Sequence, residues 1–346
     1  MGIGRWALGV YTPEMLKKVA FVVAVLLLLG GVVLGALLAA GYRVAVDGSG
    51  KWPRFLTRTD YDALEADRAR QQEAPSSTAA EASTGAMNAK SEAQSVPARG
   101  SETGARPVGA SATATTAEET SAATWTDFRG PNRDGRYAAT PIRTNWPREG
   151  LPRLWKQPVG GGYASFVVAD GRAFTIEQRR NQEVVAAYDV RTGREVWTNG
   201  WNANFQESMG GDGPRATPTY HEGRIYALGA EGELRALDAG KGSLIWRKNI
   251  LTDNNAGNLQ WGMSAAPLIV DDKVIVLPGG RSGKSIAAYN KDTGAPVWKS
   301  LNDQQSYTSP MLVTLAGRRQ IVLISAPRAL GVAVEGGSLL WQYPWV

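Results

Sequence analysis

The pattern of hydrophobic and polar positions divides the chain into three parts. Residues 19–42 are an apolar run of 24 residues without a charge, and residues 43–123 are mostly polar. From residue 124 onward, short apolar runs alternate with turns rich in Gly, Asp and Asn. The last pattern is typical of short β-strands. The first run is long enough to cross a membrane, because a helix rises about 1.5 Å per residue and the hydrocarbon layer is roughly 30 Å thick.

The apolar run predicts a transmembrane signal anchor over residues 19–42, with residues 1–18 as a cytoplasmic N-terminus. A cleaved signal peptide is the alternative, but its apolar part normally spans only about 7–15 residues. Basic residues lie on both sides of the run, among them Lys17, Lys18 and Arg43. The positive-inside rule therefore does not fix the orientation of the anchor.

The polar part of the chain predicts a tether. Residues 43–70 are expected to form a juxtamembrane polar segment, and the stretch "DYDALEADRARQQEA" at 60–74 is suited to a short polar helix. Residues 71–123 contain almost no aromatic or large aliphatic side chain. Such a segment cannot bury enough apolar area to offset the entropy lost on ordering. We therefore predict a disordered linker that holds the domain of residues 124–346 away from the bilayer.

A unit of eleven residues recurs in this last domain. It reads "AYDVRTGREVW" at 187–197, "ALDAGKGSLIW" at 236–246 and "AYNKDTGAPVW" at 288–298, and a weaker copy ends at Trp341. With Trp155 in "LPRLWKQPV", the tryptophans follow one another at intervals of 42, 49, 52 and 43 residues. These intervals fit one four-stranded propeller blade each.

The residue types of the unit indicate what it does. An Asp or Asn followed by Thr-Gly or Lys-Gly predicts a hairpin between the third and fourth strands, because the side chain can bond nearby N–H groups and glycine accepts a positive φ. The tryptophan then falls on the fourth strand, where its indole can pack against the neighbouring blade. We predict that five tryptophans join the blades: Trp155, Trp197, Trp246, Trp298 and Trp341.

The unit resembles the repeat of the pyrroloquinoline-quinone (PQQ) type β-propellers, Ala-x-Asp-x-x-Thr-Gly-x-x-x-Trp. Its first copy matches every position, with Ala187, Asp189, Thr192, Gly193 and Trp197. The resemblance covers residues 125–346 and implies an all-β propeller of four-stranded antiparallel blades. Rings of this family usually hold seven or eight blades. The four repeats are therefore interpreted as an incomplete ring, which leaves open a truncated sequence, a chain that pairs with another, or a small closed ring.

The resemblance implies two kinds of function. The family includes periplasmic quinoprotein dehydrogenases and non-catalytic propellers, such as the lipoprotein that helps assemble outer-membrane β-barrels. Alcohol-oxidising members carry a vicinal disulfide against the quinone, a Glu/Asn/Asp calcium set and an aspartate base. This chain has no cysteine, and no run matches the calcium set. We therefore expect no cofactor and no metal, and we favour a protein-binding or envelope-assembly scaffold over an enzyme.

Other functions stay open at this point. The alternative is a dehydrogenase that uses PQQ and calcium to oxidise a small alcohol or sugar. A sensor or adhesion head would differ from the scaffold only in its partner. In each case the resemblance to exported bacterial propellers implies a chain anchored in the bacterial inner membrane, with its propeller on the periplasmic side.

Charge and loop composition indicate where a partner binds. The net charge of +6 comes from basic residues scattered among acidic ones, without the basic stripe typical of nucleic-acid binding. Loops that lead into first strands converge around a propeller axis and are better candidates for a protein partner or small ligand. Their candidate residues are Asp212, Arg215, Gln260, Trp261, Gln305 and Tyr307; ordinary turn chemistry is the alternative. The polar tip "EQRRNQE", residues 177–183, is interpreted as a solvated hairpin.

Overall fold

The computed structural model describes residues 13–40, 42–45, 54–57, 61–73, 124–137, 141, 144–207 and 210–345. The chain divides into two units, of which the first comprises residues 1–60 with 208–210. This unit holds helix α1 (Pro13–Ala39) and a sheet of β1 (Tyr42–Ala45) and β2 (Arg54–Thr57). By length and composition, Lys17–Ala39 could span a membrane. The helix ends three residues before the end predicted for the anchor, and β1 begins there.

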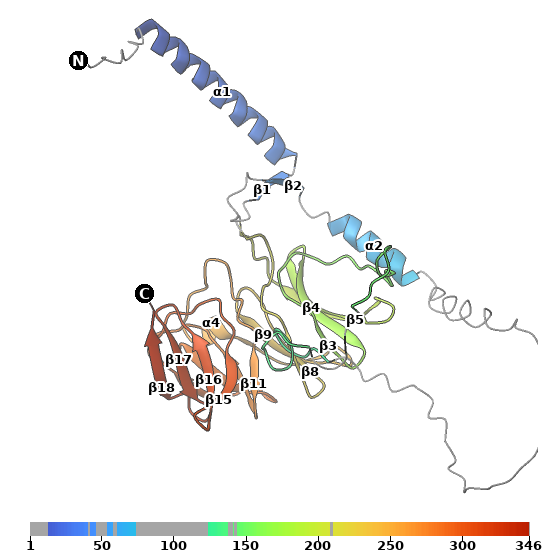
Figure 1. The fold of residues 1–346 in the computed structure, drawn as a ribbon, viewed down its shortest axis with the longest axis vertical. Coiled ribbons are helices and arrows are strands. Elements are labelled where there is room, and N and C mark those ends of the chain that lie inside the picture. The colour runs from blue at the N-terminus through green and yellow to red at the C-terminus, as the bar shows by residue number, and fades with distance from the viewer. Residues whose placement is uncertain are drawn as a thin grey trace, which may run out of the picture. The chain divides into compact units, whose positions relative to one another are not determined.

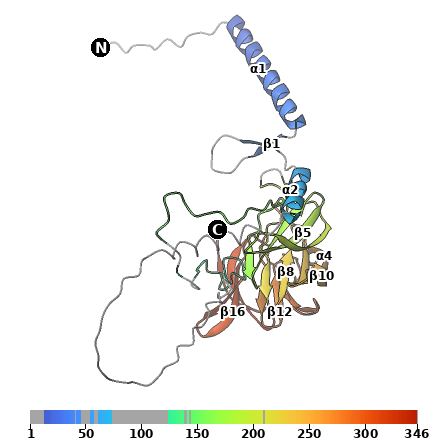
Figure 2. The same cartoon turned by 90° about the vertical axis from the view of Figure 1, so that its right-hand side faces the viewer.

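The second unit starts with helix α2 (Tyr61–Glu73), the short polar helix expected from the sequence. This helix includes the first three residues of the predicted linker, and the rest of that linker, residues 74–123, lies outside the described residues. Figures 1 and 2 show α2 beside the strands β4 and β5.

Four antiparallel sheets of four strands follow in chain order (Figure 1). Blade 1 contains β3 (Val167–Ala169), β4 (Arg172–Arg179), β5 (Gln182–Asp189) and β6 (Glu195–Asn202). Blade 2 contains β7 (Thr219–His221), β8 (Arg224–Leu228), β9 (Glu233–Asp238) and β10 (Leu244–Asn249), followed by the short helix α4 (Ile250–Asp253). Blade 3 contains β11 (Leu268–Val270), β12 (Lys273–Val276), β13 (Ile286–Asn290) and β14 (Pro296–Ser300). Blade 4 contains β15 (Met311–Leu315), β16 (Arg318–Ile324), β17 (Arg328–Ala333) and β18 (Leu339–Pro344).

The sheets are arranged as propeller blades, which confirms the predicted fold class. The first strands of consecutive blades contact one another, so these strands form the inner edges and the tryptophan-bearing strands the outer edges. Three clusters of buried apolar side chains fill the spaces between consecutive blades. Between blades 1 and 2, for example, Phe174 and Val185 pack with Ile225 and Leu237.

The hairpin between the third and fourth strands has the chemistry expected from the repeat. Asp189 Oδ1 accepts hydrogen bonds from the backbone N–H groups of Arg191 (3.1 Å) and Thr192 (2.8 Å) and from the Thr192 hydroxyl (2.9 Å). Gly193 follows with φ +70°. The Asn290 hairpin of blade 3 repeats these three bonds.

Four tryptophans dock on the hairpin of the blade that follows them. Their indole Nε1 atoms donate to backbone carbonyls at 2.8–3.1 Å, in the pairs Trp155–Val190, Trp197–Ala239, Trp246–Lys291 and Trp298–Val334. Their rings lie against the hairpin glycines Gly193, Gly242, Gly294 and Gly337. A Cβ at any of these glycines would come within 3 Å of an indole carbon.

Trp341 lies differently from the other four tryptophans. In each blade the tryptophan is the register partner of a small residue on the third strand, which is Ala187 for Trp197 but Gly331 for Trp341. In both blades the pairing shifts by a β-bulge directly beside this partner, so the bulge does not distinguish the two tryptophans. Because Gly331 has no Cβ, the Trp341 ring lies over its own blade and donates to Gln320 Oε1.

Candidate functional site

The loops that lead into first strands lie at one end of the blades, together with the hairpins between second and third strands. We call this end the loop face. Its connections run over residues 203–218, 250–267 and 301–310, of which 208 and 209 are not described. All six candidate binding residues predicted from the sequence lie in these connections.

Trp261 and Tyr307 form an exposed aromatic pair on the loop face. Their ring centroids are 5.4 Å apart, and the Tyr307 hydroxyl accepts a hydrogen bond from the Trp261 backbone N–H at 3.3 Å. The two side chains are 38% and 39% exposed. Gln305 ties the same two loops together by donating to the Gly257 carbonyl at 2.9 Å. Gln260 is exposed in the turn beside Trp261. The structure thus brings these four candidates together.

The other two candidates, Asp212 and Arg215, lie in the connection between blades 1 and 2. The Arg215 guanidinium donates to the carbonyls of Gly211 (2.6 Å) and Gly213, so it stabilises its own loop. It also stacks over Phe205, 4.5 Å from the ring centroid, and burial lowers its pKa. Asp212 is half-buried beside Gly161.

Phe205 connects the two groups of candidates. A Cβ built on Gly262, the neighbour of Trp261, would lie 3.1 Å from the end of the Phe205 ring. On the other side of Arg215, the Tyr163 ring centroid is 5.6 Å from the guanidinium, and Tyr163 is 63% exposed. An aromatic row that contains Arg215 therefore crosses the loop face from Tyr163 to Tyr307.

Glu183 is a buried carboxyl that the sequence analysis missed. It is fully buried on β5, between blades 1 and 2, and its Oε1 accepts a hydrogen bond from the Ala230 N–H at 2.8 Å. Gln178 and Trp201 are its register partners on the two neighbouring strands. Burial raises the pKa of Glu183 to about 7, against the opposing effect of the Ala230 amide and the Trp201 indole.

The interpretation of residues 177–183 as a solvated hairpin was wrong. Only the turn itself, Arg180 to Gln182, is exposed, whereas Glu177, Gln178 and Glu183 are buried. Glu177 is ion-paired with Arg179 at 2.5 Å and accepts a hydrogen bond from the Tyr188 hydroxyl at 3.1 Å. Two of the partners that accompany this burial are distant in sequence, Arg68 for Glu177 and the Ala230 N–H for Glu183, and no local pattern of residues 177–183 indicates them.

Arg133 joins the inner edges of three blades. Its buried guanidinium donates to the Pro310 carbonyl at 2.8 Å, to the Pro267 carbonyl and to the Thr219 hydroxyl, all at the starts of first strands. It is ion-paired with Asp127 at 2.8 Å. Burial raises the pKa of Asp127 and lowers that of Arg133, although their mutual attraction opposes both shifts. Arg133 thus links the inner edges of blades 2, 3 and 4.

Comparisons with known proteins agree with this architecture. Residues 180–345 match the family described as outer membrane protein assembly factor BamB. The chain is 28% identical over 151 residues to the protein of that name from Shewanella oneidensis, which covers 41% of this chain and 36% of the relative. It is 30% identical over 150 residues to the quinohemoprotein alcohol dehydrogenase of Comamonas testosteroni, which covers 40% of this chain and 20% of the relative.

A solved structure gives a weaker match. The quinohemoprotein alcohol dehydrogenase ADH-IIG of Pseudomonas putida superposes with a TM-score of 0.39 at 18% identity, over 54% of this chain and 34% of that one. The matched region spans little more than a third of the curated relatives' length at most. The repeat motif, the four blades and the family match agree with one another. The repeat region of this chain is therefore a β-propeller of the pyrroloquinoline-quinone repeat type.

Proposed function

We propose that this protein is a membrane-tethered envelope scaffold whose propeller binds a protein partner through its loop face. The anchor is α1 in the bacterial inner membrane, and the propeller lies on the periplasmic side. The observation that carries the proposal is the exposed Trp261–Tyr307 pair, which is held rigidly by two connected loops. Exposed aromatic side chains that lose little entropy on binding are typical anchors of protein interfaces.

The surroundings of this pair support protein binding. Gln260 offers an amide group beside the two rings, and the exposed Tyr163, next to Arg215 and the buried Phe205, extends the surface towards blade 1. Because Arg215 bonds its own loop, it keeps this row in place. The matching relative is an outer membrane protein assembly factor, which agrees with a partner in envelope assembly.

Photo-crosslinking tests the proposal. A photoreactive amino acid at Gln260 should give a discrete crosslinked protein in cells, whereas the same group at the exposed Thr198 on β6 should not. The double variant Trp261→Ala with Tyr307→Ala should reduce the product at least tenfold. Trp146→Ala, which removes another exposed tryptophan, is the matched control. Equal products from positions 260 and 198 would contradict the proposal.

The match to a quinohemoprotein alcohol dehydrogenase favours a second function, a PQQ- and calcium-dependent dehydrogenase. Among the described residues, no three or more His, Cys, Asp or Glu side chains form a cluster that could hold a metal ion. Arg133 and Asp127 are paired with each other at the inner ends of the blades. We therefore derive no catalytic step through the quinone.

Titration with the quinone and calcium distinguishes the two functions. The scaffold predicts no stoichiometric uptake of PQQ, measured by absorbance of the protein after gel filtration, and no reduction of an artificial electron acceptor with small alcohols or sugars. Uptake of one quinone per chain together with dye reduction would establish the dehydrogenase.

A further inference from the structure

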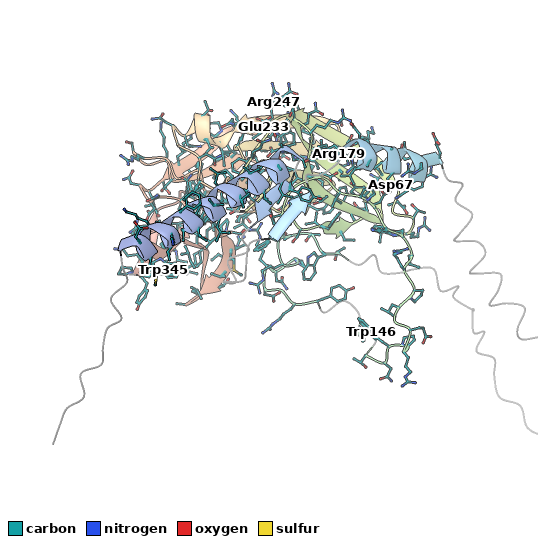
Figure 3. All side chains as sticks on the ribbon, turned by 90° about the horizontal axis from the view of Figure 1, so that it is seen from above. Asp67, Trp146, Arg179, Glu233, Arg247 and Trp345 are labelled. Carbon is teal, nitrogen blue, oxygen red and sulfur yellow. The ribbon has the colours of Figure 1, made fainter. Side chains whose placement is uncertain are left out.

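Helix α2 packs on blade 1 although it comes before the predicted linker. The Arg68 side chain is 4% exposed, lies 3.6 Å from the equally buried Glu177 carboxylate, and donates to the Pro158 carbonyl at 3.2 Å. Asp62, near the start of the helix, is ion-paired with Arg180 at the β4–β5 turn. Figure 3 shows Arg179 of β4 next to α2, the helix that carries Asp67.

The contacts continue along the whole helix. At its start, the Tyr61 hydroxyl lies beside Gly161, where a Cβ would be 3.3 Å away. At its end, the Gln72 carbonyl accepts a hydrogen bond from Arg194 of blade 1. Helix α2 and the propeller accordingly form one compact unit.

Ion pairs and hydrogen bonds dominate this packing. Six of the thirteen residues of α2 are charged, and Arg68 is its one buried side chain. An open hollow of about 400 Å³ remains between Gln72 and the strand that carries Trp197. The exposed pair of Asp62 with Arg180 weakens with salt, because the Debye length falls from about 10 Å at 0.1 M to about 3 Å at 1 M, whereas the buried pair of Arg68 with Glu177 is screened much less.

We propose that α2 is a clasp that fixes both ends of residues 74–123 to the propeller, and that its release lengthens the connection between membrane and propeller. This rests on the proposed membrane anchoring by α1. With the clasp closed, only residues 40–60 separate the anchor from the propeller unit, a reach of about 70 Å at most. With the clasp open, residues 40–123 separate them, and the limit becomes about 290 Å. The clasp therefore sets how far from the bilayer the loop face can find a partner.

The absence of cysteine from the chain allows a direct test with spin labels. In the full chain in detergent, labels at Ala69→Cys on α2 and Arg191→Cys on blade 1 should give one narrow distance distribution at low salt. The release variant, Arg68→Gln with Arg180→Gln, should broaden it, and 1 M NaCl, which screens mainly the exposed Asp62–Arg180 pair, should broaden it less. Arg70→Gln is the matched control, because Arg70 is exposed and, among the described residues, forms its ion pair within the helix, with Asp67. A broad distribution in the parent chain, or equal broadening by Arg70→Gln, would overturn the clasp.

A second measurement tests the reach separately. In vesicles, a fluorophore on Arg191→Cys should transfer energy to a lipid-headgroup dye several-fold less efficiently in the release variant than in the parent chain. If the spin labels show the clasp but energy transfer is the same in both chains, the proposed lengthening is wrong and the proposed anchoring is in question, whereas the docking of α2 stands.

Discussion

The indole of Trp246 on blade 2 lies directly against Gly294 in the hairpin of blade 3. The Trp246 Nε1 donates to the Lys291 carbonyl at 2.8 Å, and a Cβ on Gly294 would lie 2.8 Å from two ring carbons. The glycine of the repeat thus has two functions, since it adopts a positive φ of 68° and also leaves room for the neighbouring blade's tryptophan. The Thr-Gly turn and the tryptophan are consequently parts of the same contact.

Gly294→Ala should therefore destabilise the propeller more than Gly317→Ala. Both glycines have a positive φ, but nothing lies within 4 Å of a Cβ on Gly317. Gly317→Ala should cost only the backbone penalty of about 1–2 kcal/mol, while Gly294→Ala should cost about 1–3 kcal/mol more for displacing the indole. Urea unfolding of both variants measures the difference. Equal costs would show that the Trp246 indole moves aside for the added Cβ at Gly294 without a measurable cost in stability.

Trp298→Ala should be more damaging than Trp341→Ala. Trp298 bonds the Val334 carbonyl of the next blade and covers Gly337, whereas Trp341 bonds Gln320 of its own blade. Truncation of a fully buried aromatic side chain typically costs about 3–5 kcal/mol; because Trp298 is half-buried, we expect about 2–3 kcal/mol for it and about half of that for Trp341. Thermal unfolding checks the order, which a larger loss for Trp341→Ala would contradict.

Glu183 should make the stability of the propeller depend on pH. Its pKa is about 7 in the folded chain and ordinarily 4.5, so the folded state binds more protons between these values and stability falls as pH rises from 4.5 to 7. Above pH 7 the cost is complete and on the order of 3 kcal/mol. Glu183→Gln should remove this dependence, since an amide oxygen can still accept the Ala230 N–H.

Unfolding free energies at pH 5 and pH 8 measure the effect of Glu183. The variant should be more stable than the parent chain at pH 8, and the gap should narrow at pH 5. The same pH dependence in both chains would mean that Glu183 is ionised throughout.

Arg133→Met should cost about 3–5 kcal/mol of stability, because it leaves the Asp127 carboxylate without its ion-pair partner and frees the Pro267 and Pro310 carbonyls. Adding Asp127→Asn should recover part of the loss, because the unpaired charge is then removed. Chemical unfolding of the single and double variants measures this recovery. A double variant no more stable than Arg133→Met would show that the carbonyl contacts alone account for the cost.

The features that could be predicted from the sequence are those that depend on residues close together in the chain. Asp189, Thr192 and Gly193 form their hairpin within a few residues of chain, so their spacing was sufficient to predict it, and the recurrence of Trp197 gave the blade length. Glu177 and Glu183 were assigned to a solvated tip, because their burial depends on Arg68 and Ala230, which lie far from them in sequence. The role of Arg133 depends on three blades at once, and no motif within one repeat indicates it.

The candidate site was predicted less completely than the fold. Trp261, Gln305 and Tyr307 were recognised because the loops before first strands meet at one end of the blades. No motif indicated that Arg215 bonds its own loop, and the position of Phe205 between the two groups depends on how consecutive connections cross.

The docking of each indole on the following hairpin has a consequence for synthesis on the ribosome. Trp246 is translated 48 residues before Gly294, and at about 5–20 residues per second it waits roughly 2–10 s for its partner. During that interval the Trp246 indole on the newest blade has no following hairpin to pack against. Nascent propellers should therefore bind chaperones in pulses, once per repeat.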